Sequence, residues 1–228
     1  MMRRFITFAV MVACLCMSLR AQTHYEGSIS IGGKAGATLS RTQFNPSVPQ
    51  SFLPGMMMGA TFRYIEERHF GLILELNVEQ RGWKELYEGT DFRYQRRFTY
   101  VQLPMLTHIF FGNERFKGFF NAGPELGYMI AHSTNSNFDY PNFADIEGFP
   151  TINRHNEQLN LDIHSRFDYG ISAGLGMEVG LARRHSIALE GRFYYGLRDV
   201  FSNHKKDPFS GSSGMSIMIT LGYNYQIK

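Results

Sequence analysis

The sequence predicts an all-β fold: one eight-stranded antiparallel transmembrane β-barrel with short periplasmic turns and long extracellular loops. Two observations carry this prediction. Apolar and polar residues alternate through eight segments, as expected where successive strand side chains point to opposite faces. The connections between these segments alternate between very short and long, which is typical of barrels in the outer membrane of Gram-negative bacteria.

The first 21 residues are typical of an export signal. Arg3 and Arg4 precede the apolar run Phe5 to Leu19, and Ala21 is a small residue at the expected cleavage site. The run is too short to cross a bilayer as a helix. We therefore expect a signal peptide over residues 1–21 and one outer-membrane barrel domain over residues 22–228.

Cleavage after Ala21 changes what the composition implies. It removes three arginines and takes the formal net charge from +3 to zero, so the overall charge does not indicate nucleic acid as a partner. It also removes both cysteines, Cys14 and Cys16, which leaves no disulfide or cysteine-bound metal. Lipoprotein processing at Cys14 is the alternative, because Met11 to Cys14 loosely resembles a lipobox.

The alternating segments define the strands in order along the chain. The predicted strands are 28–40, 55–65, 69–81, 100–111, 116–131, 168–182, 185–198 and 215–228. One face of each strand is apolar and uncharged, as in the last strand, where Ile217, Ile219 and Leu221 alternate with Met218, Thr220 and Gly222. We expect the apolar face to contact lipid, because its many bulky side chains would not fit inside eight strands. A soluble lipocalin-like barrel with the apolar face inside is the competing arrangement.

The opposite face of these strands carries a predicted structural charge cluster in the barrel interior. Its members are Lys34, Arg63, Glu75, Glu79, Arg81, Glu125, Glu178, Glu190 and Arg192. Five carboxylates facing four cations indicate a packed set of ion pairs, and a narrow channel is the functional alternative. An interior of eight strands is filled by side chains, whereas open porins use about 16 to 18 strands.

Prolines and glycines inside the strands need a local explanation. Pro104 and Pro124 each remove a backbone donor in a barrel with no free edge, so we predict β-bulges at both positions. Gly170 and Gly174 would face inward and leave room for large inward groups such as Arg192.

Several short motifs resemble the PorT-type family of small outer-membrane β-barrels. They are Tyr100-Val101-Gln102-Leu103-Pro104, Asn121-Ala122-Gly123-Pro124 with Gly127-Tyr128, the glycine-rich strand from Gly170 to Gly180, and Leu221-Gly222-Tyr223. The resemblance covers the mature chain and implies the barrel fold. It also implies a role as an accessory of protein secretion, since the family includes a component associated with a secretion system.

Motifs that resemble enzyme sites lack the required context. Gly170-Ile171-Ser172-Ala173-Gly174 matches a nucleophile elbow in letters, but that motif needs a strand-to-helix turn. His132-Ser133 and His164-Ser165 lie near the predicted outer rim, yet neighbouring strand residues point to opposite faces. We therefore expect no enzyme activity, cofactor, metal or nucleotide, with a lipid-modifying rim enzyme as the alternative.

The long loops are the expected place of function. Leu159, Leu161 and Ile163 continue the alternation of the sixth strand, which predicts a ribbon projecting past the membrane. Phe138, Tyr140, Phe143 and Phe149 form a possible loop binding patch, with buttressing of the ribbon as the alternative. The leading hypothesis is a non-enzymatic protein whose partners are outer-membrane lipid and possibly another envelope or secretion protein.

Overall fold

A computed structural model describes residues 27–113, 115–151, 154–203 and 207–228. The predicted signal peptide and Cys14 lie outside the described residues. The strands are β1 (Ser28–Asn45), β2 (Gln50–Ser51), β3 (Leu53–Glu67), β4 (Phe70–Glu85), β5 (Tyr94–Gly112), β6 (Phe116–Ser136), β7 (Phe167–Ala182), β8 (His185–Asp199) and β9 (Gly211–Gln226). Two 3₁₀ helices, η2 (Tyr140–Asp145) and η3 (Glu157–Asn160), follow β6. No helix in these ranges is long and apolar enough to cross a membrane.

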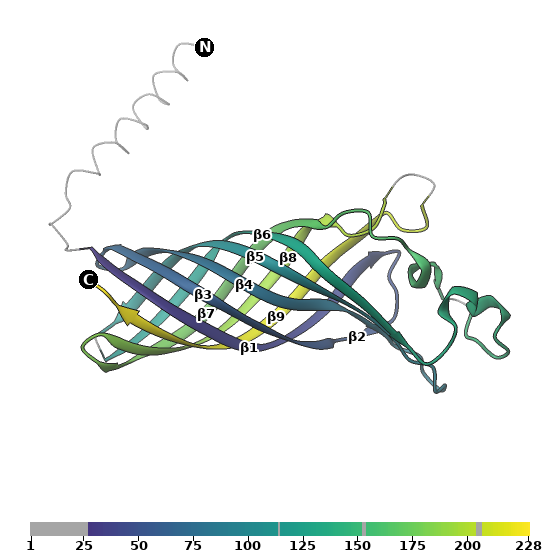
Figure 1. The fold of residues 1–228 in the computed structure, drawn as a ribbon, viewed down its shortest axis with the longest axis horizontal. Helices are drawn as coiled ribbons and strands as arrows, with labels where there is room; N and C mark the ends of the chain where they lie inside the picture. Colours follow the sequence, from purple (N-terminus) through teal and green to yellow (C-terminus); the bar gives the residue numbers. More distant parts are fainter. Residues whose placement is uncertain (1–26, 114, 152–153, 204–206) are drawn as a thin grey trace, which may run out of the picture.

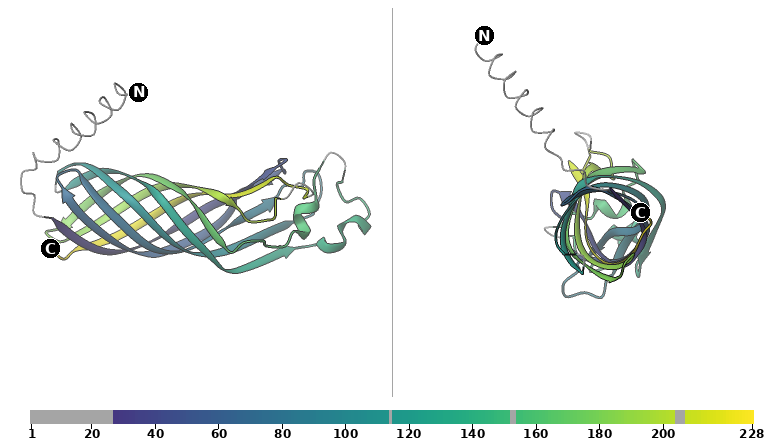
Figure 2. Two further views of the ribbon diagram at one scale, coloured as in Figure 1. Left: turned by 90° about the horizontal axis from the view of Figure 1, so that it is seen from above. Right: turned by 90° about the vertical axis from the view of Figure 1, so that its left-hand side faces the viewer.

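Eight of these strands close into an antiparallel barrel, which confirms the predicted fold. Each strand pairs with the next one along the chain, and β1 pairs with both β3 and β9 to close the ring. The short β2 pairs only with β4. The short turns and the start of β1 lie at one end, together with the C-terminus (Figure 1), and Figure 2 shows the ring from that end.

The apolar face of the barrel is the outer face, as predicted. Leu76 and Ile219 expose 56% and 61% of their surface, whereas Glu79 exposes none. The charged face lies inside, so the lipocalin-like arrangement is wrong for this chain. An outer surface of this kind is stable only in contact with lipid.

The strands are longer than a bilayer requires, and their polarity inverts at the extracellular end. Spanning takes about 9 to 11 residues, whereas β5 has 19 and β6 has 21. Beyond the apolar band, outward positions become polar at Arg41 and Arg97, while inward positions become aromatic at Phe44 and Trp83. The barrel therefore continues outside the membrane as a part with a soluble-type core, which we call the extracellular head.

The predicted bulges at the two prolines are wrong. Leu74 pairs with Met105 and Asn77 with Gln102 in one register on either side of Pro104. The register between β5 and β6 is likewise unchanged across Pro124. The β5–β6 ladder shifts instead between Thr99 and Tyr100, near the base of the head. Each proline thus interrupts the ladder locally without inserting a residue.

The predicted extension of β7 is also wrong, although other strands do project. β7 begins at Phe167, and Leu159 lies in η3. Tyr94 Oη donates to the Leu159 carbonyl at 3.0 Å, and the Arg96 guanidinium donates to the Leu161 carbonyl at 2.6 Å. These two inward side chains of β5 hold the segment inside the head, so it does not continue as a strand.

Candidate functional site: the lumen and the extracellular head

The lumen contains stacked layers of ion pairs made by the predicted charge cluster. In the middle of the barrel, Glu75 lies between two cations, 2.6 Å from Lys34 Nζ and 2.7 Å from the Arg192 guanidinium. Arg192 also contacts Glu190 at 2.8 Å. All these side chains are nearly inaccessible to solvent. Buried charges of this kind require partners, which the register of the strands supplies.

The layer nearer the periplasm is a two-pronged pair between Arg63 of β3 and Glu178 of β7. A polar cavity of about 40 Å³ lies between these layers and is lined by His108 and Asn121 among others. This volume accommodates roughly one or two waters. The cavity is too small for an organic ligand.

The layer nearest the head is centred on one cation, Arg81. Its guanidinium contacts Glu79 at 2.8 Å, Asp168 at 3.2 Å and Glu125. It also lies 3.6 Å above the centre of the Tyr194 ring. Asp168 is a lumen residue that the sequence analysis missed, although it alternates in phase with Gly170. Six lumenal carboxylates therefore face four cations in the described part of the chain.

Inward glycines provide the space for these layers. A Cβ on Gly170 would lie 2.2 Å from the Tyr195 carbonyl oxygen and 2.7 Å from the Tyr194 ring. A Cβ on Gly174 would lie 2.9 Å from Glu190 Oε1. The glycines of β7 thus make room for the ion pairs and rings of β8.

Ser172, in the motif that resembles a nucleophile elbow, lies in the middle of β7. Its side chain is fully buried, and Oγ donates a hydrogen bond to Glu125 Oε2 at 2.5 Å. There is no strand-to-helix turn at this position. His132 and His164 are exposed near the base of the head. Within the described ranges, no group of three or more histidine, cysteine or acidic residues has a metal-binding arrangement.

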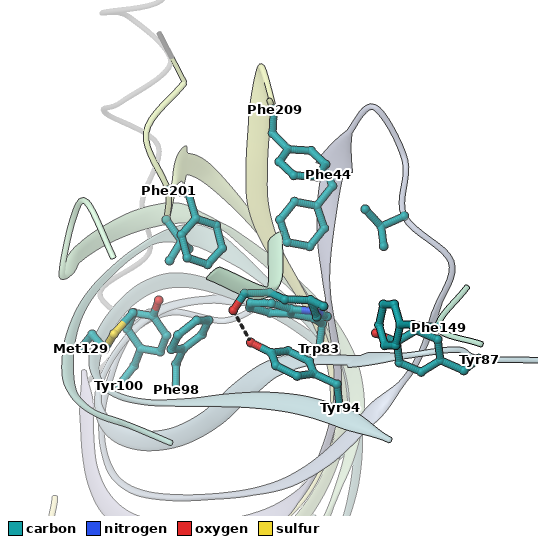
Figure 3. Packing of buried hydrophobic residues seen from close by; sticks show 13 residues of the cluster. Phe44, Trp83, Tyr87, Tyr94, Phe98, Tyr100, Met129, Phe149, Phe201 and Phe209 are labelled. Carbon is teal, nitrogen blue, oxygen red and sulfur yellow. Dashed lines mark hydrogen bonds between the residues drawn. The ribbon is translucent and has the colours of Figure 1, made fainter. Parts of the chain in front are cut away.

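The extracellular head has an aromatic core that covers the outer end of the lumen (Figure 3). Trp83 is fully buried and packs against Phe44 and Phe98, with ring centres 5.3 and 5.8 Å apart. Phe201 packs on Trp83 from the loop between β8 and β9 at 5.7 Å. Tyr100 connects this core to the charged layers, because its ring lies 5.4 Å from the Arg81 guanidinium.

The four aromatic residues predicted as a binding patch are part of this packing. Phe149 is buried, and its ring lies 5.1 Å from Phe138 and 5.5 Å from Phe143. Tyr140 packs on Tyr94 at 5.4 Å. The other three rings are half-buried, and their packing on the head core is the arrangement expected for the buttressing alternative. A role of these four residues in binding stays a prediction.

A polar clasp attaches the long loop between β6 and β7 to β4. Glu85 accepts hydrogen bonds from Trp83 Nε1 at 2.9 Å, Gln158 Nε2 at 3.1 Å and the Arg154 guanidinium at 2.5 Å. Arg154 also lies 4.1 Å above the Tyr87 ring. Burial raises the pKa of Glu85, because desolvation of the carboxylate outweighs the three donors.

One strand edge in the head has no strand partner among the described residues. β6 pairs with β7 only as far as Tyr128 and Phe167, and Met129 N then donates to the Arg166 carbonyl at 2.7 Å. Residues 131–136 of β6 pair with β5 on one side, and Ile130 is the extra residue at the register shift. On the other side, none of the described residues pairs with them. Most of these residues are exposed. We call residues 130–136 the free β6 edge.

Comparison with known proteins places this barrel among outer-membrane proteins. The chain is similar to OprG from Pseudomonas aeruginosa, with a TM-score of 0.50 and 12% identity over 90% of this chain and 97% of that one. It is also similar to AlkL (TM-score 0.48, 8% identity, 92% and 94% covered) and to the neisserial surface protein NspA (0.43, 10%, 88% and 99%). At such identities the likeness concerns the fold alone. No curated protein matches the sequence.

The family model named "Outer membrane protein beta-barrel domain" matches residues 20–202, which is most of the chain. That match agrees with the closed barrel, its lipid-facing outer surface and its ion-paired lumen. The protein resides in the outer membrane and belongs to the outer membrane protein beta-barrel domain family.

Proposed function

We propose that this barrel is a non-enzymatic binding protein that captures an extended segment of another envelope or secreted protein on the free β6 edge. The main observation behind this proposal is that β6 continues to Ser136, eight residues beyond its last pair with β7. Unpaired strand edges are uncommon in native proteins, which usually cover or shorten them. An exposed edge binds an incoming strand through main-chain hydrogen bonds.

The backbone groups available on this edge follow from the antiparallel ladder. Asn137 N donates to the Arg93 carbonyl at 3.2 Å on the β5 side. Because hydrogen-bonding positions alternate along an antiparallel pair, the amides and carbonyls of His132, Thr134 and Ser136 point away from β5. The edge therefore offers three successive donor and acceptor sets, enough to bind a short extended peptide.

A second copy of the chain is a poor occupant for geometric reasons. Two copies in one membrane are related by an axis along the membrane normal, and barrel strands tilt by about 35 to 45° from that axis. The two β6 edges would therefore cross at roughly twice the tilt, or about 70 to 90°. Strands that cross at this angle cannot form a ladder. A flexible segment of a different protein has no such restriction.

The resemblance to PorT-type barrels supports a secretion accessory as the setting of this binding. A protein that emerges from a secretion machine is partly extended, and an edge at the cell surface is well placed to bind it. The filled lumen supports the interpretation that the barrel serves only as a membrane anchor. Ion-pair layers and the aromatic core fill it from Arg63 to Trp83.

The proposal is tested by photo-crosslinking in living cells from a benzoylphenylalanine placed at His132, which is exposed on the edge. Thr134→Pro removes an edge-facing donor without removing a bond to β5, so the barrel should still fold. We expect the crosslinked adduct to be lost in Thr134→Pro and kept in Thr134→Ala, which alters only the side chain. An adduct that survives Thr134→Pro would show that the backbone edge is not the binding element.

A further inference from the structure

Four arginines surround the barrel where the lipid-facing band meets the extracellular head. They are Arg41, Arg97, Arg166 and Arg198, which we call the outer arginine belt. Arg41 lies two residues beyond the lipid-facing Leu39, and Arg198 directly follows the lipid-facing Leu197. Arg166 directly precedes Phe167, which is 43% exposed. Each arginine is thus close in sequence to the end of an apolar stripe.

Neighbouring groups contact three of these side chains close to the end of the apolar band. The Arg97 guanidinium donates to Gln80 Oε1 at 3.0 Å and to the Pro54 carbonyl at 3.1 Å, which directs it back towards the apolar band. Arg41 lies 5.5 Å from the centre of the exposed Phe52 ring. Arg198 lies 5.8 Å from the Phe167 ring in the same manner.

The belt has no acidic partner in the described part of the chain. None of its guanidiniums forms an ion pair with a carboxylate of the described residues, whereas Arg63, Arg81, Arg154 and Arg192 all do. Phe52, just before β3, and Pro54, near the start of β3, contact Arg41 and Arg97 on one side of the barrel. On another side, Arg198 lies over the Phe167 ring, and Arg166 directly precedes Phe167 in the sequence. The charges therefore occur as two pairs close to the outer end of the apolar band.

We propose that the outer arginine belt binds phosphate groups of the outer-leaflet lipid. Guanidinium groups form two-pronged hydrogen bonds with phosphate oxygens, and their flat faces rest on aromatic rings as they do here. Basic residues at a membrane surface are attracted by anionic headgroups at this depth. Phosphorylated glycolipid around the barrel would hold the base of the head, and with it the free β6 edge, at a set height above the membrane.

The test uses the full-length protein in lipid nanodiscs with bis-phosphorylated lipid A, followed by mass spectrometry of the lipid that stays bound after detergent extraction. Replacing the belt (R41Q, R97Q, R166Q, R198Q) should lower lipid A retention by about tenfold or more. The control variant carries the same change of charge on the exposed periplasmic turns (R68Q, R115Q, R183Q, R184Q) and should retain lipid A as the wild type does. Dephosphorylated lipid A should be retained equally by all three proteins.

Folding of each variant is checked by its heat-dependent migration in detergent gels. The smaller variant R41Q, R166Q keeps the Arg97 contacts and should still lose part of the retained lipid. Free inorganic phosphate should not displace lipid A, because the binding groups are held at the bilayer surface. Equal retention by the belt variant and the wild type would overturn the proposal, as would an equal loss in the periplasmic control.

Discussion

Arg81 contacts more carboxylates than any other lumen cation of the described residues. Its guanidinium serves three carboxylates, those of Glu79, Glu125 and Asp168, and packs on the Tyr194 ring. Removing one partner of a buried ion pair leaves an uncompensated charge, which is the costly case. The lumen layer near the head therefore depends on one side chain.

Arg81→Met should lower the free energy of unfolding by about 3 to 5 kcal/mol, the usual cost of breaking a buried pair. Arg183→Met, at an exposed periplasmic turn, should change it by no more than about 0.5 kcal/mol. Guanidinium unfolding in detergent, followed by fluorescence of Trp83, measures both values. Adding Glu125→Gln to Arg81→Met should recover part of the loss. Equal stability of the two single variants would contradict the assigned role of Arg81.

The clasp residue Glu85 predicts a pH dependence of the head. Burial raises its pKa above the ordinary value of 4.5, so the folded head binds a proton more readily than the unfolded chain does. The resulting stability is fully present below pH 4.5 and is lost as the pH rises through the raised folded pKa. The head should therefore be more stable at acidic pH than at neutral pH.

Melting followed by Trp83 fluorescence between pH 4 and pH 7 tests this dependence. In the wild type the transition of the head should shift to lower temperature as the pH rises. Glu85→Gln removes the titrating group and should flatten that part of the slope. Glu88→Gln, at an exposed position three residues away, should leave the slope unchanged. A slope that is the same in all three proteins would assign the effect to other groups.

At the scale of a strand, the two faces of β9 have opposite environments. Ile219 exposes 61% of its surface to lipid, while Thr220 beside it is buried in the lumen. Ile219→Arg should cost about 2 to 4 kcal/mol near the bilayer midplane, whereas Ile227→Arg at the periplasmic end should cost about 0 to 1 kcal/mol. Guanidinium unfolding in lipid vesicles compares them. Equal costs would mean that the lipid-facing surface is misassigned.

At the scale of the molecule, side chains fill the lumen along the barrel axis. The Arg63, Arg192 and Arg81 layers and the aromatic core follow one another from the periplasm outward. A polar cavity among the charged layers has a volume of only about 40 Å³. We therefore predict that the lumen anchors the head and does not conduct solutes.

Planar bilayer recordings should therefore show no unit conductance for the wild type. The double variant Trp83→Ala, Phe201→Ala opens only the aromatic core, so it should also remain silent because the ion-pair layers persist. Stable, ion-selective steps in the wild type would contradict the anchor role. Steps in the double variant alone would identify the aromatic core as a gate.

Much of the barrel is determined by the sequence alone. Period-two alternation assigns each residue to a face, and the strand number, the short turns and the nine predicted lumen charges follow from it. These features are local, since neighbouring residues on one strand suffice to define them. Asp168 was not predicted as a lumen residue because it lies at a predicted strand end, where alternation defines a face least clearly.

The packing of the extracellular head depends on tertiary contacts. Leu159, Leu161 and Ile163 alternate like a strand, yet two β5 side chains 65 residues away hold that backbone inside the head. Burial of the loop aromatics depends on the same tertiary contacts, because the Phe149 ring packs on Phe138 and Tyr87. A period-two pattern shows that a segment has an apolar side. Which partner covers that side, and whether β6 keeps a free edge, depends on contacts between segments far apart in the chain.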